Sequence, residues 1–306
     1  MNTGLKITAF AAALAATFGA AYGVGKGVDP VVAKPVSHAG HGESGDGAGS
    51  GYAGHEAPLP GGLQVSEGGY GLDLKTPRVE AGKAADIRFA VTGRDGRPVT
   101  AFKSEHGKEL HLIVASSDLN VYRHLHPVRA ADGTWSVAVQ LPDAGGYRVF
   151  ADFMPADVKD AKGAQGSKGA EGLVLGADLA VSGAYAPKEL PAPAATARVE
   201  DGYEVSLEGA LVPGRTGELK LSVAKDGKPV SDLEPYLGAY GHLVALRSGD
   251  LAYLHVHPND GGPGPVVSFS ATPPSAGAYR LFLDFQHGGK VRTAAFTVHV
   301  GGHFAA

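Results

Sequence analysis

The feature that most constrains the fold is an internal repeat, because the second half of the chain copies the first at an offset of 131 to 133 residues. The segment 95–99 (DGRPV) matches 226–230 (DGKPV), and 146–153 (GYRVFADF) matches 278–285 (AYRLFLDF). Such self-similarity indicates two copies of one structural unit, related by duplication. The length of 306 residues agrees with this, since about 150 residues per domain is typical.

Each copy consists of short apolar stretches separated by turn residues. Gly 46 and Pro 20 favour turns over long helices, and the Asp-Gly pairs at 95–96 and 226–227 are tight-turn signals. Seven strands in about 100–115 residues are typical of an immunoglobulin-like sandwich. The expected strands are 69–75, 85–92, 109–116, 120–126, 134–141, 146–154 and 173–182, then 202–208, 217–225, 241–248, 251–257, 266–272, 277–286 and 291–300.

The sequence therefore predicts an all-β chain of two tandem immunoglobulin-like β-sandwich domains, which follow an N-terminal hydrophobic helix. The first module is expected at 61–186 and the second at 187–306. The join, 187–195, contains two prolines and is expected to be short and fairly stiff.

The N-terminus carries nineteen uncharged residues, Ile7–Gly25, between Lys6 and Lys26. As a helix they would span roughly 28 Å, close to the hydrocarbon thickness of a bilayer. Residues 1–28 are therefore predicted to be a membrane anchor or a cleaved signal peptide. Either alternative places the rest of the chain outside the cytoplasm. Residues 29–60 have almost no large apolar side chains and are predicted to be a disordered Gly/Ser/His linker.

Composition excludes several function classes. The net charge is −4 without a basic run, which argues against a nucleic-acid partner. Cysteine is absent, which excludes disulfides, thiolate metal sites and cysteine nucleophiles. We also find no Gly-x-Ser-x-Gly elbow, no His-Glu-x-x-His and no phosphate-binding loop. Histidine, by contrast, occurs 13 times, so the side chains able to bind a metal ion are imidazoles and carboxylates.

Histidines occupy matching places in the two copies. In each, a first histidine is followed 13 residues later by a His-x-His-Pro motif. Side chains two apart on a strand share a face and lie about 6.8 Å apart, so both rings can reach one cation at ~2.0–2.1 Å. A hairpin through 117–118 would bring in the third ring. An aspartate on a later strand is a further ligand or a carboxylate that fixes a ring tautomer, and Met154 is a soft axial candidate. The candidate metal ligands are His111, His124, His126, Asp152 and Met154 in the first module and His242, His255, His257 and Asp284 in the second.

Two alternatives remain open for these residues. The histidines could form a hydrogen-bonded cluster that only stabilises the edge of a sandwich. Asp152 and Asp284 could instead form surface ion pairs, because Arg148 and Arg280 precede them by four residues on the same face.

The donor set also indicates which metal to expect. Imidazole and carboxylate suit copper(II), with zinc(II) as the alternative, and the Irving–Williams order places copper(II) first. Binding requires neutral imidazole, so the affinity is expected to fall below about pH 6.5.

The motifs His124-Leu-His126-Pro and His255-Val-His257-Pro, on Cys-free sandwich modules of an exported chain, resemble the YtkA-like and CopC-like copper-handling domains of bacterial exported proteins. The resemblance covers about 69–182 and 202–300. It implies extracytoplasmic copper carriage, buffering or delivery. The expected partners are the metal ion, an exported copper protein and, if the N-terminal helix is not cleaved, the membrane. CopC-type domains use a histidine at the mature N-terminus that has no counterpart here, so their ligand set is not transferred.

Two other functions compete with metal carriage. Immunoglobulin-like sandwiches also serve as metal-free adhesion or scaffold modules. His-Val-His on a sandwich strand is in addition similar to copper/zinc superoxide dismutases, although the loop histidines and the disulfide of those redox enzymes are missing here.

Overall fold

The computed structural model describes residues 59–105, 107–156, 172–254 and 256–301, with only the backbone of His257. Near the N-terminus it describes residues 10, 12–13 and 15–18. The chain divides into two compact units, 1–56 and 57–306.

The described residues of the N-terminal unit are helical, and the Thr17 hydroxyl donates to the Ala13 carbonyl at 2.8 Å. Among the residues that the structure describes, no helix has the length and apolar character needed to cross a membrane. The rest of the predicted 1–28 segment and the predicted linker up to residue 58 lie outside the described residues.

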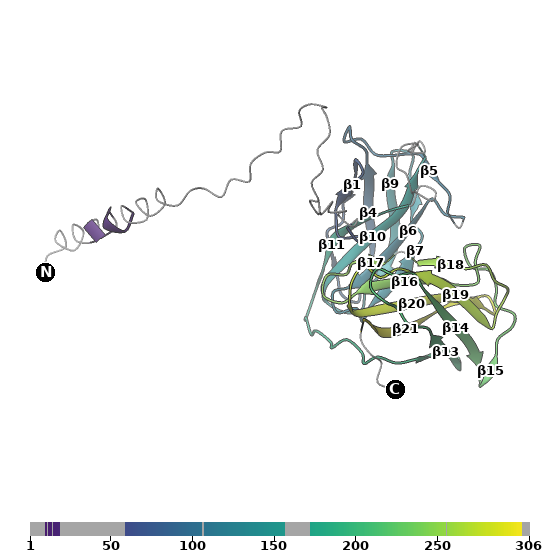
Figure 1. Ribbon diagram of the computed structural model, residues 1–306. Helices are drawn as coiled ribbons and strands as arrows, with labels where there is room; N and C mark the ends of the chain where they lie inside the picture. The colour runs from purple at the N-terminus through teal and green to yellow at the C-terminus, as the bar shows by residue number, and fades with distance from the viewer. Residues whose placement is uncertain are drawn as a thin grey trace, which may run out of the picture. The chain divides into compact units, whose positions relative to one another are not determined.

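The first module is a sandwich of two sheets, blue to teal in Figure 1. One sheet has the strand order β1-β2-β4-β9-β8 and the other β3-β11-β10-β6-β7, with β5 paired to β10. All pairings are antiparallel except that of β3 with β11. The strands are β1 (Ser66–Glu67), β2 (Tyr70–Leu74), β3 (Arg78–Glu80), β4 (Ala84–Thr92), β5 (Phe102–Lys103), β6 (Leu110–Ser116), β7 (Tyr122–Leu125), β8 (Val128–Arg129), β9 (Thr134–Gln140), β10 (Gly145–Pro155) and β11 (Leu173–Ser182).

The second module repeats this plan, green to yellow in Figure 1. Its sheets have the orders β12-β13-β14-β19-β18, with β15 paired to β14, and β17-β16-β20-β21. The strands are β12 (Thr196–Val199), β13 (Tyr203–Glu208), β14 (Gly217–Lys225), β15 (Lys228–Pro229), β16 (His242–Arg247), β17 (Tyr253–Leu254), β18 (Val256–Pro258), β19 (Val266–Ala271), β20 (Gly277–His287) and β21 (Lys290–Val300). The prediction of two tandem immunoglobulin-like sandwiches is therefore confirmed.

Each sandwich buries alternate side chains of its strands between its sheets. On β10 these are Tyr147, Val149, Ala151 and Phe153, and the equivalent residues of β20 lie in the second core. The alternation follows from the two-residue period of a strand. It leaves Phe150 and Asp152 on the outer face of β10.

Two predicted strands differ from those in the structure. The expected strand 251–257 is split into β17, which pairs with β16, and β18, which pairs with β19 of the other sheet. Likewise, β7 ends at Leu125, so the prediction that the strand extends to His126 is wrong. The cause is Pro127, which cannot donate to a ladder and restricts the residue before it.

The outer faces of the two modules pack against each other in a third hydrophobic core, which we call the junction. Its members come from both modules: Ile113, Ala115, Leu119, Tyr122, Phe150 and Val174 from the first, and Val244, Leu246, Leu251, Tyr253 and Phe282 from the second. Burial on both faces explains why β6, β10, β16 and β20 are almost continuously apolar, as buried central strands are.

The junction relates the two copies by an approximate twofold axis. The Tyr122 hydroxyl donates to Asp284 Oδ2 at 3.2 Å, and the Tyr253 hydroxyl donates to Asp152 Oδ2 at 3.3 Å. These residues are counterparts in the repeat, so each copy uses the same surface to bind the other, as in an isologous dimer. Burial, together with the nearby carboxylates, raises the pKa of Tyr122 and of Tyr253 well above the usual value, so both remain donors.

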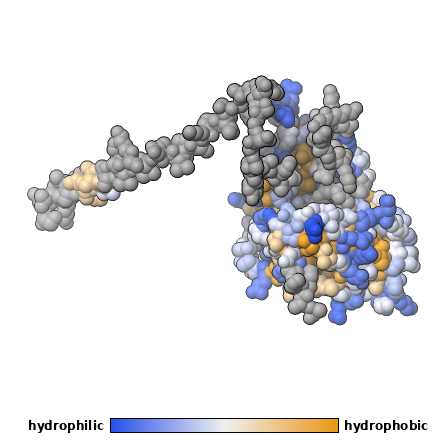
Figure 2. Space-filling model, in the orientation of Figure 1, coloured by the Kyte–Doolittle hydropathy of each residue, from blue (hydrophilic) through white to orange (hydrophobic). Residues whose placement is uncertain are grey.

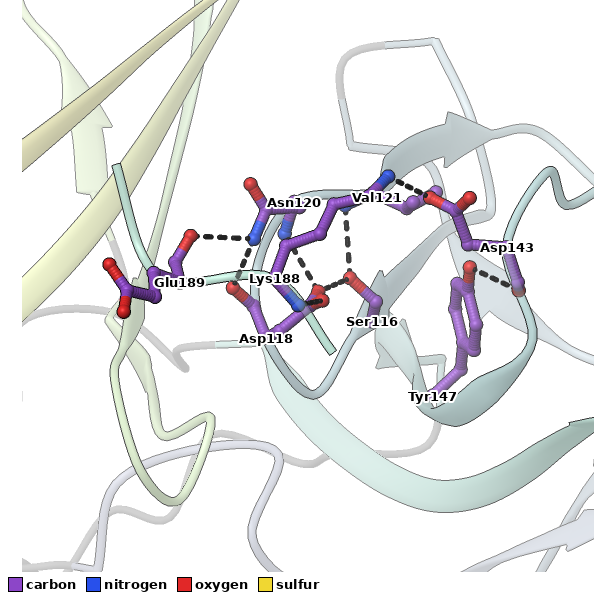
Figure 3. A network of polar contacts seen from close by, with 8 residues as sticks. All are labelled: Ser116, Asp118, Asn120, Val121, Asp143, Tyr147, Lys188 and Glu189. Atoms are coloured by element: carbon purple, nitrogen blue, oxygen red, sulfur yellow. Dashed lines mark hydrogen bonds and ion pairs between the residues drawn. The ribbon is translucent and has the colours of Figure 1, made fainter. Parts of the chain in front are cut away.

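A turn next to the junction fixes the segment that joins the modules (Figure 3). The Asp118 carboxylate accepts from the Ser116 hydroxyl at 2.6 Å and from the backbone N–H of Lys188 at 3.1 Å, while the Asn120 amide donates to the Glu189 carbonyl at 3.2 Å. In the same turn Leu119 has φ 58°, a conformation unfavourable for a leucine. Its side chain is only 1% exposed in the junction, and this burial offsets the backbone cost.

Among the described residues of the two modules, the large apolar side chains that are exposed are single residues in the sequence. They are Leu59, Val65, Val128, Tyr185, Val212, Val266 and Val291, and hydrophobic and hydrophilic residues are interspersed on the face shown in Figure 2. Isolated exposed apolar residues are normal for a soluble surface. The apolar outer faces of the central strands are therefore hidden by the junction.

Substitution of Phe282 tests the junction. Its ring stacks on Tyr122 with 4.1 Å between centroids and 6° between planes. We expect Phe282→Ala to lower the free energy of unfolding by about 3–5 kcal/mol in urea denaturation, because it removes a buried ring and leaves a cavity. Val212→Ala, at a position 48% exposed, serves as control and should change it by less than about 0.5 kcal/mol. Equal losses for the two variants would contradict the packing of the outer faces.

Candidate metal centre

Three histidines of the first module lie together beside the junction. His111, His124 and His126 each place one potential ligand atom so that these atoms lie within 4.8 Å of one another. Their ring centroids are 5.3 Å (111–124), 5.4 Å (111–126) and 4.9 Å (124–126) apart. A cation bound at ~2.0–2.1 Å by three imidazoles in tetrahedral geometry holds the ring centroids roughly 5 Å apart. The three rings therefore already have the spacing of a metal site. We call them the histidine triad.

The hairpin of β6 and β7 brings the triad together. In its register Ile113 lies opposite His124 and Leu112 opposite Leu125. His111 lies two residues from Ile113 and so shares the outer face with His124. His126 follows immediately after β7, and its ring lies on the same outer face as the rings of His111 and His124. The predicted hairpin thus delivers the third imidazole, as the spacing implied.

Hydrogen bonds fix the tautomers of two members of the triad. His111 Nε2 lies 3.3 Å from the Glu105 carbonyl oxygen, and His124 Nδ1 lies 2.9 Å from Asp284 Oδ2. A carbonyl and a carboxylate only accept, so these ring nitrogens carry the protons and donate. When both rings are neutral, the other nitrogens, His111 Nδ1 and His124 Nε2, carry lone pairs, and they face each other at 3.0 Å. Two acceptors at this distance need a proton or a cation between them.

His126 supplies the third nitrogen. Its Nε2 is buried and has no hydrogen-bond partner among the described residues. A buried polar atom without a partner is costly unless something else satisfies it. Burial, and then the nearby positive groups, lowers the pKa of His126 to about 4, and burial and His124 lower that of His111 to about 3. Both rings are therefore neutral at pH 7, as metal binding requires.

The second module supplies the carboxylate of this site. Asp284 is 2% exposed, and besides His124 its carboxylate accepts from the Tyr122 hydroxyl at 3.2 Å and from the Thr293 hydroxyl at 2.5 Å. The sequence placed Asp284 in a separate cluster of the second module. The structure places it against a histidine of the first module, where it orients the ring.

His242 also lies beside the triad. Its ring centroid is 6.1 Å from that of His111 and 6.0 Å from that of His124. Its Nε2 lies 3.0 Å from the carbonyl oxygen of Tyr236. Thus the first histidine of the second module lies close to the triad of the first.

The remaining predicted ligands fall into two groups. Asp152 lies directly opposite His111 in the register of β10 and β6 and accepts from Tyr253, and Met154 lies opposite Lys103 on the same face of β10. His255 and the side chain of His257 lie outside the described residues. The predicted cluster in the second module therefore stays a prediction.

The arginines proposed as alternative partners of the aspartates make other contacts. Arg148 pairs with Asp178 at 2.6 Å and donates to the Gly62 carbonyl at 2.7 Å. Arg280 donates to the Thr297 hydroxyl at 3.0 Å. Sequence reasoning also missed the contacts of two tyrosines, Tyr122 and Tyr253, with the aspartates of the opposite module. The two tyrosines occupy matching positions in the repeat, and this match was the sequence signal that could have identified them.

Fold and cluster together define a class: a tandem immunoglobulin-like β-sandwich protein with a histidine cluster at the junction of its modules. A family model described as a domain of unknown function, DUF8832, matches residues 64–162 and 197–302, one segment in each module. The chain belongs to this family. No curated protein matches it.

Solved structures with detectable similarity include bacterial surface proteins. The adhesin FdeC of Escherichia coli is 12% identical with a TM-score of 0.23, over 80% of this chain and 66% of that chain. InvE, an adhesin of Yersinia pseudotuberculosis, is 12% identical with a TM-score of 0.25, over 77% and 60%. Invasin, a bacterial integrin-binding protein, is 12% identical with a TM-score of 0.21, over 74% and 38%. This chain thus spans less than two thirds of the length of each of these structures.

The lowered pKa values predict how the metal-free protein responds to acid. Unfolded histidines titrate near 6.5, whereas the folded pKa is about 3 for His111 and about 4 for His126. From about pH 6.5 downward the unfolded chain binds protons that the folded protein excludes, so the free energy of unfolding falls with pH. We expect chelator-treated protein to lose stability between about pH 7.5 and about pH 5 in urea denaturation. His126→Leu should lose less, and His299→Ala, at an exposed position, should follow the wild type. Parallel pH dependence in the wild type and His126→Leu would be evidence against a buried neutral His126.

Proposed function

We propose that this protein is an extracytoplasmic metal-binding protein that carries, buffers or delivers copper(II) through its histidine triad. The observation that carries the proposal is the pair of facing acceptors, His111 Nδ1 and His124 Nε2 at 3.0 Å. Beside them lies His126 Nε2, which has no hydrogen-bond partner among the described residues. A purely structural cluster of neutral imidazoles would pair donors with acceptors. A cation accepts all three lone pairs at once.

Copper(II) is favoured by the donor set. The chain has no cysteine, and the three nitrogens are imidazole donors, for which copper(II) has the highest affinity among the divalent first-row metals. Zinc(II) suits the same donors and is the alternative ion. The resemblance of the histidine motifs to copper-handling domains supports copper as well.

An extracytoplasmic location is proposed from the N-terminal sequence. Lys6 followed by nineteen uncharged residues is the pattern of an export signal or an anchor. Outside the cytoplasm, a cysteine-free site of imidazoles resists oxidation and suits copper(II). The exported partner that would receive or supply the ion is part of this proposal.

Copper titration of the full chain tests the function. We expect the double variant His124→Ala/His126→Ala to lose one equivalent of tightly bound copper(II), measured by elemental analysis after desalting. The electron paramagnetic resonance spectrum of the wild type should show coupling to imidazole nitrogens that the double variant lacks. His299→Ala keeps the histidines at 111, 124 and 126 and should bind as the wild type does.

Other outcomes separate the competing functions. Copper bound equally by the wild type and the double variant, or by neither, would reject the triad and favour a metal-free adhesion or scaffold module. Copper together with superoxide turnover would favour the redox enzyme. A circular dichroism spectrum unchanged by the substitutions shows that the loss of metal is not a loss of fold.

A further inference from the structure

We propose that the metal site is shared by the two modules: His242 of the second module supplies a fourth imidazole, and Asp284 of the second module orients His124 of the first, so that one bound cation links the modules. This inference rests on the proposed metal-binding function. It differs from the sequence-based expectation, in which each module holds a cluster of its own.

The position of His242 fits a fourth ligand. Its ring centroid lies 6.1 Å from that of His111 and 6.0 Å from that of His124. Imidazoles around one ion have centroids roughly 5 Å apart in a tetrahedral site and about 6.5 Å apart when trans in a square-planar one. The two separations fall between these limits, so a small side-chain adjustment is enough for His242 to bind the same ion.

The tautomer of His242 fits this role as well. Its Nε2 donates to the carbonyl of Tyr236, six residues earlier, just as His111 Nε2 donates to the carbonyl of Glu105, six residues earlier. In both rings Nδ1 is therefore the nitrogen that carries the lone pair. The two counterparts, His111 and His242, thus present the same atom on either side of the twofold axis of the junction.

Asp284 makes the site depend on both modules. A carboxylate that accepts from a ligand histidine fixes its tautomer and increases its basicity, and loss of such a group typically weakens metal binding 10- to 100-fold. Here the histidine belongs to the first module and the carboxylate to the second, and Tyr122 of the first module donates to the same oxygen, Oδ2. If the modules separate, His124 loses the group that orients it.

Metal binding and docking of the modules are then linked. A cation that binds only the docked arrangement stabilises it, and docking in turn raises the affinity for the cation by the same factor. The junction therefore does more than join two domains, since the occupancy of the site regulates how firmly the modules hold together.

The test measures copper(II) affinity of the full chain by competition with a chelator of known affinity. We expect Asp284→Asn to bind 10- to 100-fold more weakly, and His242→Ala at least 10-fold more weakly, with the loss partly restored by added imidazole. In the electron paramagnetic resonance spectrum, His242→Ala should lose the coupling of one nitrogen. His299→Ala, an exposed histidine of the same module, should stay within about twofold of the wild type.

Hydrogen exchange of the wild-type protein provides a second measurement that needs no variant. Copper should slow exchange in β16 and β20 of the second module as well as in β6 and β7 of the first. Protection confined to the first module, or unchanged affinity and spectrum in His242→Ala and Asp284→Asn, would overturn the shared site while leaving the proposed function intact. A wild-type protein that binds no copper would instead end the proposed function itself.

Discussion

The structure depends on the burial of two outer sheet faces against each other. A lone sandwich needs only one buried face on each sheet, yet β6 and β10 bury apolar side chains on both faces, and so do β16 and β20. The junction thereby removes from water the polar groups at its edge, among them His111, His124 and Asp284. Buried polar groups are costly unless they are hydrogen-bonded. That cost explains why these rings have fixed partners and a defined orientation.

Duplication supplied the symmetry of the junction, and divergence has made its two sides unequal. Asp284 lies opposite Thr293 in its sheet, whereas its counterpart Asp152 lies opposite Val174. The threonine hydroxyl donates to Asp284 Oδ1, and a valine has no hydroxyl to donate. The carboxylate that orients His124 thus accepts a hydrogen bond from a position at which the first module has a valine.

Much of the fold could be predicted from the sequence, and the reason is local. Alternation along each strand and the Asp-Gly turns determine strands within one module, so the bounds of most predicted strands were close. The exceptions are the end of β7 before Pro127 and the division between β17 and β18, and the short strands β1, β3, β5, β8, β12 and β15 were not predicted. The hairpin that gathers the triad was predictable for the same reason. The contacts of Asp284 and His242 were not, because they join residues far apart in the chain, 160 positions in the pair His124–Asp284. The sequence signal for the junction was the presence of apolar residues, such as Ile113 and Phe150, at strand positions that face away from the core of their own module.

The facing nitrogens of the two neutral rings are a local conflict among the buried polar groups that the structure describes. A sequence that specifies a single fold normally satisfies its buried polar groups, and the exceptions concentrate at functional sites. Here the carbonyl of Glu105 and the carboxylate of Asp284 each accept a hydrogen bond from a ring, which leaves the lone pairs of the two neutral rings facing each other. If either Glu105 or Asp284 presented a hydrogen-bond donor in place of its acceptor, one ring could change its tautomer and donate to the other. With both acceptors in place, a cation between the two ring nitrogens removes the repulsion of their lone pairs. Because Glu105 belongs to the first module and Asp284 to the second, the arrangement of the site depends on the junction.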